Sequence, residues 1–192
     1  WSSWIYIKDL PTDDAYHHIF NKGNKEFILG VDKNIGSGIA SINNCPGLYL
    51  TKSSDGDSYT ATLHLVVNTS GETPGSVGEE TMNITDIPIK NWVNVIIRCK
   101  NTMIDIYING TIADRLNLSG TPIQNFNNVN VCQNNGFSGN LSALLYYSRA
   151  IDIFKINKIV NDGPLLNAPS ADRGDLPKSF GFLSNKWYSN KM

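Results

Sequence analysis

Asp55 and Asp57 are the carboxylates whose spacing first suggests chemistry. They stand two residues apart in the turn-like stretch Asp55-Gly56-Asp57-Ser58. Calcium sites in proteins are built from several oxygen ligands, carboxylates among them, but Asp residues in a glycine-containing turn usually bond their own backbone. We therefore name Asp55 and Asp57 as weak candidates for ligand binding or a calcium site, and otherwise expect no metal and no cofactor.

The histidines and serines do not form a nucleophilic motif. His17, His18 and His64 lie in strand-like stretches, where a structural role is the simplest interpretation. A hydrolase of the Gly-x-Ser-x-Gly type needs a glycine two residues on either side of its serine, whereas Ser37 is flanked directly by Gly36 and Gly38. The sequence thus predicts no catalytic residues.

Cys45, Cys99 and Cys132 are far apart in the chain. They follow none of the CxxC or Cys/His spacings of zinc sites. Cys99 and Cys132 lie in strand-like runs, so we expect them to be buried free thiols. One disulfide with a leftover thiol stays an open alternative.

Composition limits the partners. The 192 residues carry a net charge of −1, with a pI of about 6.3 and scattered lysines and arginines, so the basic surface that nucleic acid needs is missing. No apolar run reaches the roughly 18 residues of a membrane span. The chain begins at Trp1 without a methionine, and we expect any signal or membrane anchor in residues that precede it.

The clearest local signal is a β-hairpin. Residues 104–108 alternate isoleucine with Asp105 and Tyr107, the period of a half-buried strand. Asn109-Gly110 follows, a pair that favours the positive φ angles of a type I′ turn, and residues 111–113 resume the strand. Residues 92–99 lead into this hairpin, which predicts a three-stranded meander.

Further short strands, separated by turn residues, predict an all-β antiparallel two-sheet sandwich. We expect these strands at residues 3–8, 18–22, 26–31, 47–51, 59–68, 129–133 and 140–148. The stretch 69–80, with its three glycines and a proline, is expected to be a long loop.

One short helix is expected near the carboxyl end of this sandwich. Asp152 is placed to cap it, isoleucines recur at helical spacing, and Gly163-Pro164 ends it. We therefore predict a domain over residues 1–163 and an irregular, aromatic-containing extension over residues 164–192. Trp187 and Tyr188 in that extension are candidate binding residues.

The order of the motifs resembles the laminin-G-like branch of the concanavalin A-like lectin/glucanase superfamily. Six stretches carry the resemblance over about residues 3–162: Ser3-Trp4-Ile5-Tyr6-Ile7, Ile19-Phe20-Asn21-Lys22-Gly23, Lys90-Asn91-Trp92-Val93-Asn94-Val95, Ile106-Tyr107-Ile108-Asn109-Gly110, Phe137-Ser138-Gly139-Asn140-Leu141 and Tyr147-Ser148-Arg149-Ala150-Ile151. The resemblance implies a jelly roll and gives structural roles to Trp4, Trp92, Asn109, Gly110, Phe137, Gly139 and Arg149.

The resemblance also implies what a hydrolase or metal-binding member would carry. Hydrolases of this superfamily place acidic residues at alternate strand positions, but none of the four glutamates has an acidic partner two residues away. Asp105, Tyr107, Asn109 and Asp114 reproduce only part of the metal-binding pattern of legume lectins, since Met103 stands where a glutamate belongs. Strand plus turn explains the same residues.

We therefore expect a non-catalytic module whose partners are protein neighbours in an assembly or glycans. The abundance of Asn and Ile is typical of an A/T-rich coding sequence, which favours a minor capsid or surface protein of a large DNA virus, located in the virion. The alternative is a carbohydrate-binding or adhesion module of a secreted or cell-surface protein. A laminarinase-like glycoside hydrolase is the remote third reading.

Overall fold

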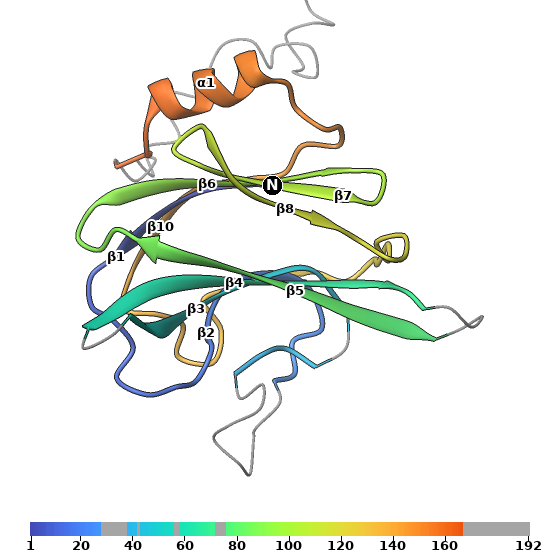
Figure 1. Ribbon diagram of the computed structural model, residues 1–192, viewed down its shortest axis with the longest axis horizontal. Helices are drawn as coiled ribbons and strands as arrows, with labels where there is room; N and C mark the ends of the chain where they lie inside the picture. Colours follow the sequence, from blue (N-terminus) through green and yellow to red (C-terminus); the bar gives the residue numbers. More distant parts are fainter. Residues whose placement is uncertain (28–37, 42, 56–57, 72–75, 167–192) are drawn as a thin grey trace, which may run out of the picture.

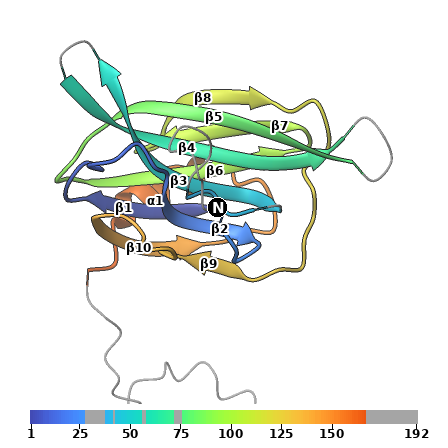
Figure 2. The same ribbon diagram turned by 90° about the horizontal axis from the view of Figure 1, so that it is seen from below.

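The computed structural model describes residues 1–27, 38–41, 43–55, 58–71 and 76–166. Within them the chain is the expected all-β sandwich of two antiparallel sheets (Figure 1). The first sheet consists, in order, of β10 (Gly139–Leu145), β1 (Ser2–Ile7), β6 (Trp92–Lys100), β7 (Met103–Ile108) and β8 (Thr111–Asn117). The second consists of β5 (Val77–Ile87), β4 (Ser58–Ser70), β3 (Asn44–Asp55), β2 (His17–Gly23) and β9 (Val129–Val131) (Figure 2).

The core lies between the sheets because apolar residues alternate along the strands. In β4, Leu63, Leu65 and Val67 belong to one buried cluster with Ile5 and Ile7 of β1 from the opposite sheet. These five side chains are at most 1% exposed. Burying a side chain of this size contributes roughly 1.5 to 3 kcal/mol, so the period-2 pattern accounts for how the two sheets hold together.

The hairpin predicted at Asn109-Gly110 is confirmed. β7 and β8 pair from Ile108 with Thr111, and the two turn residues have φ angles of 49° and 84°. The side-chain Oδ1 of Asn109 also accepts a hydrogen bond from the backbone N–H of Asn94, at 2.8 Å. The turn is therefore fixed both by its own backbone and by the neighbouring strand β6.

The expectation of a loop over residues 69–80 is wrong for its described residues. β4 continues to Ser70, and β5 begins at Val77 and pairs with β4 along its length. Met82 and Ile84 are buried on β5, while Asn83 between them is exposed. This edge strand is not recognisable in the sequence, because its solvent-facing side is polar and its carboxylates and glycine interrupt the apolar pattern.

The predicted helix is confirmed as α1 (Ile153–Asp162), which covers the outer face of the first sheet (Figure 1). Ile156 and Ile159 pack there against Ile96 of β6. Asp152 caps the helix by accepting a hydrogen bond from the N–H of Lys155 at 2.8 Å. In the described part of the chain, no helix has the length and apolar character needed to cross a membrane.

Replacing Asp152 with alanine is expected to lower the free energy of unfolding by about 1 kcal/mol, since an orphan helix N–H loses its acceptor. Urea denaturation checks this. Asp162→Ala is the control: it removes an exposed carboxylate that pairs with Lys158 at 3.1 Å, and such pairs contribute only about 0.3 to 0.5 kcal/mol. Equal losses for both variants would contradict the capping role.

The prediction that Cys99 and Cys132 are buried is wrong. Both are exposed, Cys45 is partly buried, and all three are free thiols. Cys99 is the penultimate residue of β6, and Cys132 follows the last residue of β9 with a φ of 46°. β9 ends before Cys132, and Cys99 faces a surface cavity that Cys45, Val67 and Ile104 also line.

Candidate functional site

The binding residues predicted from sequence fall mostly outside the described part of the chain. Asp55 ends β3, and its backbone pairs with Ser58 at the start of β4. The side chain of Asp55 and all of Asp57, Trp187 and Tyr188 lie outside the described residues. Among the residues that are described, no group of three or more His, Cys, Asp and Glu side chains gathers to hold a metal ion.

The residues singled out by motif occupy strand and turn positions. Trp4 is buried in β1, Trp92 begins β6, and Phe137 packs against the core. A Cβ at Gly139 would stand 2.1 Å from the carbonyl oxygen of Tyr6, so this contact requires glycine. Arg149 is exposed in the connection from β10 to α1.

Asp105 is part of the lectin-like metal pattern, but its carboxylate forms ion pairs with two arginines. Its carboxylate is 2% exposed, with Oδ2 at 3.0 Å from Nη1 of Arg98 and Oδ1 at 2.6 Å from Nε of Arg115. Both oxygens therefore accept charge-assisted hydrogen bonds from protein cations. Asp105 holds neighbouring strands together, and this arrangement leaves no position for a metal.

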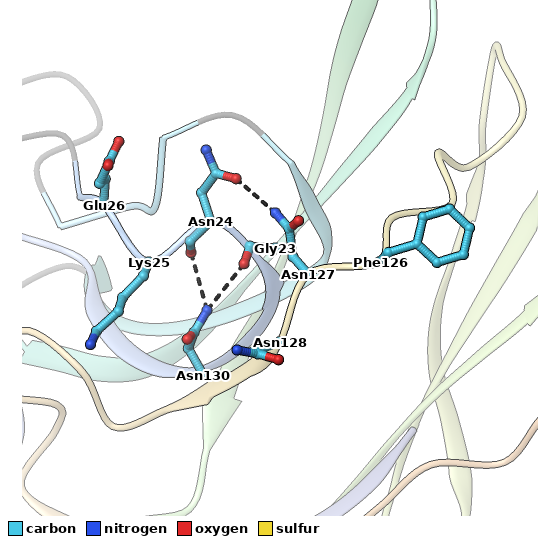
Figure 3. A pocket seen from close by; sticks show the side chains of 8 residues that line it. All are labelled: Gly23, Asn24, Lys25, Glu26, Phe126, Asn127, Asn128 and Asn130. Atoms are coloured by element: carbon cyan, nitrogen blue, oxygen red, sulfur yellow. Dashed lines mark hydrogen bonds between the residues drawn. The ribbon is translucent and has the colours of Figure 1, made fainter.

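The structure brings together a different set of residues, which we call the amide pocket. It is a cavity of about 380 Å³ where the turn after β2 meets the chain entering β9 (Figure 3). Its lining consists of Gly23, Asn24, Lys25, Glu26, Phe126, Asn127, Asn128 and Asn130. Half of these residues are asparagines, and the only charged residues in the lining are one lysine and one glutamate.

Hydrogen bonds hold the amides of this pocket in place. Nδ2 of Asn127 donates to Oδ1 of Asn24 at 2.8 Å, which joins the two segments across the pocket. Nδ2 of Asn130 donates to the carbonyl oxygens of Gly23 and Asn24, both at 3.2 Å. A ligand therefore meets side chains that are already ordered, and less conformational entropy is lost on binding.

Several polar groups of the pocket are left for a ligand. Asn128 is exposed, and its amide makes no hydrogen bond to any described residue (Figure 3). The same holds for Nδ2 of Asn24 and Oδ1 of Asn127, whose other amide atoms bond each other. Each amide offers donors and an acceptor, so together these atoms match a partner that both donates and accepts.

Phe126 stands at the rim of the amide pocket. Its ring is fully exposed and points away from the amides (Figure 3). Its segment is fastened to β2 on both sides: Nδ2 of Asn125 donates to the carbonyl of Lys22 at 3.1 Å, and Nζ of Lys22 donates to the carbonyl of Asn127 at 2.5 Å. The backbone that carries Phe126 is therefore fixed, and it holds an exposed apolar ring at the rim of the amides.

A buried polar network supports the pocket from the side of β2 and β3. Asn21 donates to the carbonyl of Asn24 at 2.9 Å and to Oδ1 of Asn44 at 3.2 Å. Oδ1 of Asn44 also accepts a hydrogen bond from the hydroxyl of Tyr49 at 2.7 Å. The backbone N–H of Asn44 donates to Oδ1 of Asn68. Asn21, Asn44 and Tyr49 are fully buried, so the hydrogen bond from Asn21 holds the turn at Asn24 in a fixed position.

His18 belongs to the same network as a neutral ring. Its Nδ1 accepts from the backbone N–H of Gln133 at 2.9 Å, and its Nε2 donates to Oδ1 of Asn21 at 3.0 Å. A proton on Nδ1 would face another donor. Burial is the main cause that lowers the pKa of His18 to about 4, although the hydrogen bond to Asn21 opposes the shift.

Sequence reasoning missed the amide pocket because its halves are far apart in the chain. Asn24 and Asn127 are 103 residues apart and both lie in connections. One signal was present in Asn125-Phe126-Asn127-Asn128-Val129-Asn130, where four amides surround an aromatic residue. An aromatic side chain among amides, outside any apolar periodicity, indicates a surface for polar recognition.

No model of a known protein family matches the sequence, and no curated protein matches it. Solved structures that it resembles include two mutants of HCR/D, with 11% and 13% sequence identity and TM-scores of 0.46 and 0.45. Each alignment covers 84% of this chain and 36% of the HCR/D chain. The chain thus spans little more than a third of those structures.

Proposed function

We propose that this chain is a non-catalytic, laminin-G-like jelly-roll module of the concanavalin A-like superfamily, and that it binds a carbohydrate in the amide pocket. One observation carries the proposal: ordered amides with unused donors and acceptors line a cavity whose rim is a fully exposed phenylalanine. Sugar hydroxyls donate and accept hydrogen bonds together, as amides do. An aromatic face, with its negative quadrupole, attracts the C–H groups of a sugar ring.

The charge of the pocket favours a neutral sugar. Lys25 and Glu26 are both exposed and opposite in sign, so the lining carries no net charge. Phosphate or sulfate groups would require more cations than this lining offers. Neutral glycans rely instead on directional hydrogen bonds, which the amides supply.

We propose a non-catalytic module because glycoside hydrolysis commonly uses two carboxyl groups that flank the scissile bond. Glu26 is the one carboxylate in the lining of the amide pocket. Binding in this pocket therefore leaves a glycan intact. We place the protein at a surface that meets glycans, on a virion or on a cell.

A second candidate function is that of a structural component, such as a minor capsid protein of a large DNA virus. Exposed apolar side chains on the edge strands, β9 and β10 among the four, favour it. Val129 and Val131 of β9 are 40% and 37% exposed, and Leu145 at the end of β10 is 43% exposed. Edge strands with such side chains are natural places for another chain to pack. Recovery of the chain at fixed stoichiometry from a purified particle would support this function.

A glycan array followed by calorimetry tests the carbohydrate proposal. We expect a neutral glycan to bind, and the double variant Asn127→Ala/Asn128→Ala to weaken it about tenfold or more, since each lost hydrogen bond contributes about 1 kcal/mol. Asn117→Ala is the matched control, because Asn117 is an exposed asparagine at the end of β8. An array without any bound glycan, or equal losses for both variants, would refute the proposal.

A further inference from the structure

Phe126 separates the amide pocket from a second cavity, which we call the Tyr146 groove. This groove has a volume of about 560 Å³. Six residues of its lining carry the argument: Lys22, Asn101, Gln124, Asn125, Phe126 and Tyr146. Phe126 lines both cavities, so the two cavities adjoin at this residue.

We infer that the ligand of this module is an oligosaccharide that crosses Phe126 and occupies both cavities, and not a single sugar. The inference rests on the proposed carbohydrate function and names its substrate class. Ligand sites commonly measure about 300 to 1,000 Å³. Two adjoining cavities of about 380 and 560 Å³ exceed what one sugar ring needs.

The Tyr146 groove offers amides, as the amide pocket does, but its lining is more apolar, since Trp1, Cys45, Cys99, Pro122 and Ile123 also line it. Asn101 and Gln124 bring exposed amides, and Asn125 brings a third that donates to Lys22. Tyr146 is 64% exposed and packs by one side on the ring of Trp1, with centroids 4.8 Å apart. Trp1 in turn packs on Phe20 of the core at 5.7 Å, so Tyr146 is supported from within.

The aromatic rings of the two cavities suit successive sugar units. Phe126 turns its ring away from the amides (Figure 3), so it does not close the pocket. Phe126 and Tyr146 line one groove, and their exposed rings are two stacking surfaces beside amide donors and acceptors. Each unit of a sugar chain presents an apolar face and polar hydroxyl groups, so a chain can contact both rings. A single sugar can contact only one of them.

Calorimetry on the full 192-residue chain with oligosaccharides of increasing length tests the inference. The probes are cello-, chito- and manno-oligosaccharides of one, three and five units, together with any glycan found on the array. We expect affinity to rise at least tenfold from one unit to five. Tyr146→Ala should remove most of that gain and leave single-sugar binding unchanged.

Controls separate the groove from overall folding. Asn101→Ala/Gln124→Ala removes exposed amides of the groove and should lower the affinity for five units only. Tyr59→Ala removes another exposed tyrosine, on β4, and should change nothing. Affinity that is independent of length, or unaffected by both groove variants, overturns this inference alone. No binding of any probe or array glycan overturns it together with the carbohydrate proposal.

Discussion

Replacing Asp105 with alanine is expected to lower the free energy of unfolding by about 3 kcal/mol or more. Asp105 is the buried carboxylate between Arg98 and Arg115, and Arg98 is itself only 20% exposed. Removing the carboxylate leaves the guanidinium of Arg98 largely buried without a counter-charge. The cost comes mainly from that uncompensated cation and not from the lost attraction.

The effect should reach α1, because Nε of Arg98 also donates to the carbonyl of Ile151 at 2.8 Å, just before the helix. Urea denaturation followed by circular dichroism measures the loss. Arg115→Ala is the control: its side chain is 50% exposed, so we expect a loss of at most about 1 kcal/mol. A loss below 1 kcal/mol for Asp105→Ala would show that Arg98 is solvated.

Acidification from pH 7 to pH 4 is expected to destabilise the fold by about 3 kcal/mol through His18. In an unfolded chain a histidine has a pKa of about 6.5, whereas burial lowers the pKa of His18 to about 4. The unfolded state therefore takes up the proton first. The stability contributed by neutral His18 is present above about pH 6.5 and is lost as the pH falls toward 4.

His64 adds an effect of the same sign, because burial lowers its pKa as well while its hydrogen bond to Asn83 opposes the shift. Denaturation curves at pH 7, 5 and 4 measure the sum. In His18→Gln the difference between pH 7 and pH 4 should shrink by about 3 kcal/mol, and in His64→Gln by less. If the free energy of unfolding depended on pH equally in wild type and in His18→Gln, His18 would not be the neutral, buried histidine that we describe.

The sandwich was predictable because its signals are local. Asn109-Gly110 determines a tight turn by backbone conformation alone, and Asp152 and Gly163 mark the two ends of one helix. Such residues act on their nearest neighbours, so their effect is readable along the sequence. β5 was missed for the opposite reason. Its pairing with β4 joins two strands of one sheet across the connection between them, and the burial of Met82 and Ile84 depends on packing in the core between the two sheets.

The candidate site was not predictable in the same way. Asn24 and Asn127 acquire their shared role only when β9 pairs with β2, from Phe20 with Val131 to Lys22 with Val129. Nothing within either connection indicates its partner. Asp105 was likewise read as strand plus turn, and its two arginine partners follow from strand register, since Arg98 and Arg115 are both paired with it.

The central claim is that a neutral glycan binds in the amide pocket, and the side-chain amide signals of the asparagines test it most directly. In a nuclear magnetic resonance titration of ¹⁵N-labelled protein with the tightest glycan of the array, the Nδ2 signals of Asn24, Asn127 and Asn128 should shift saturably. The signal of Asn117 should stay in place. Unmoved signals from the three pocket asparagines at saturating glycan would contradict the account.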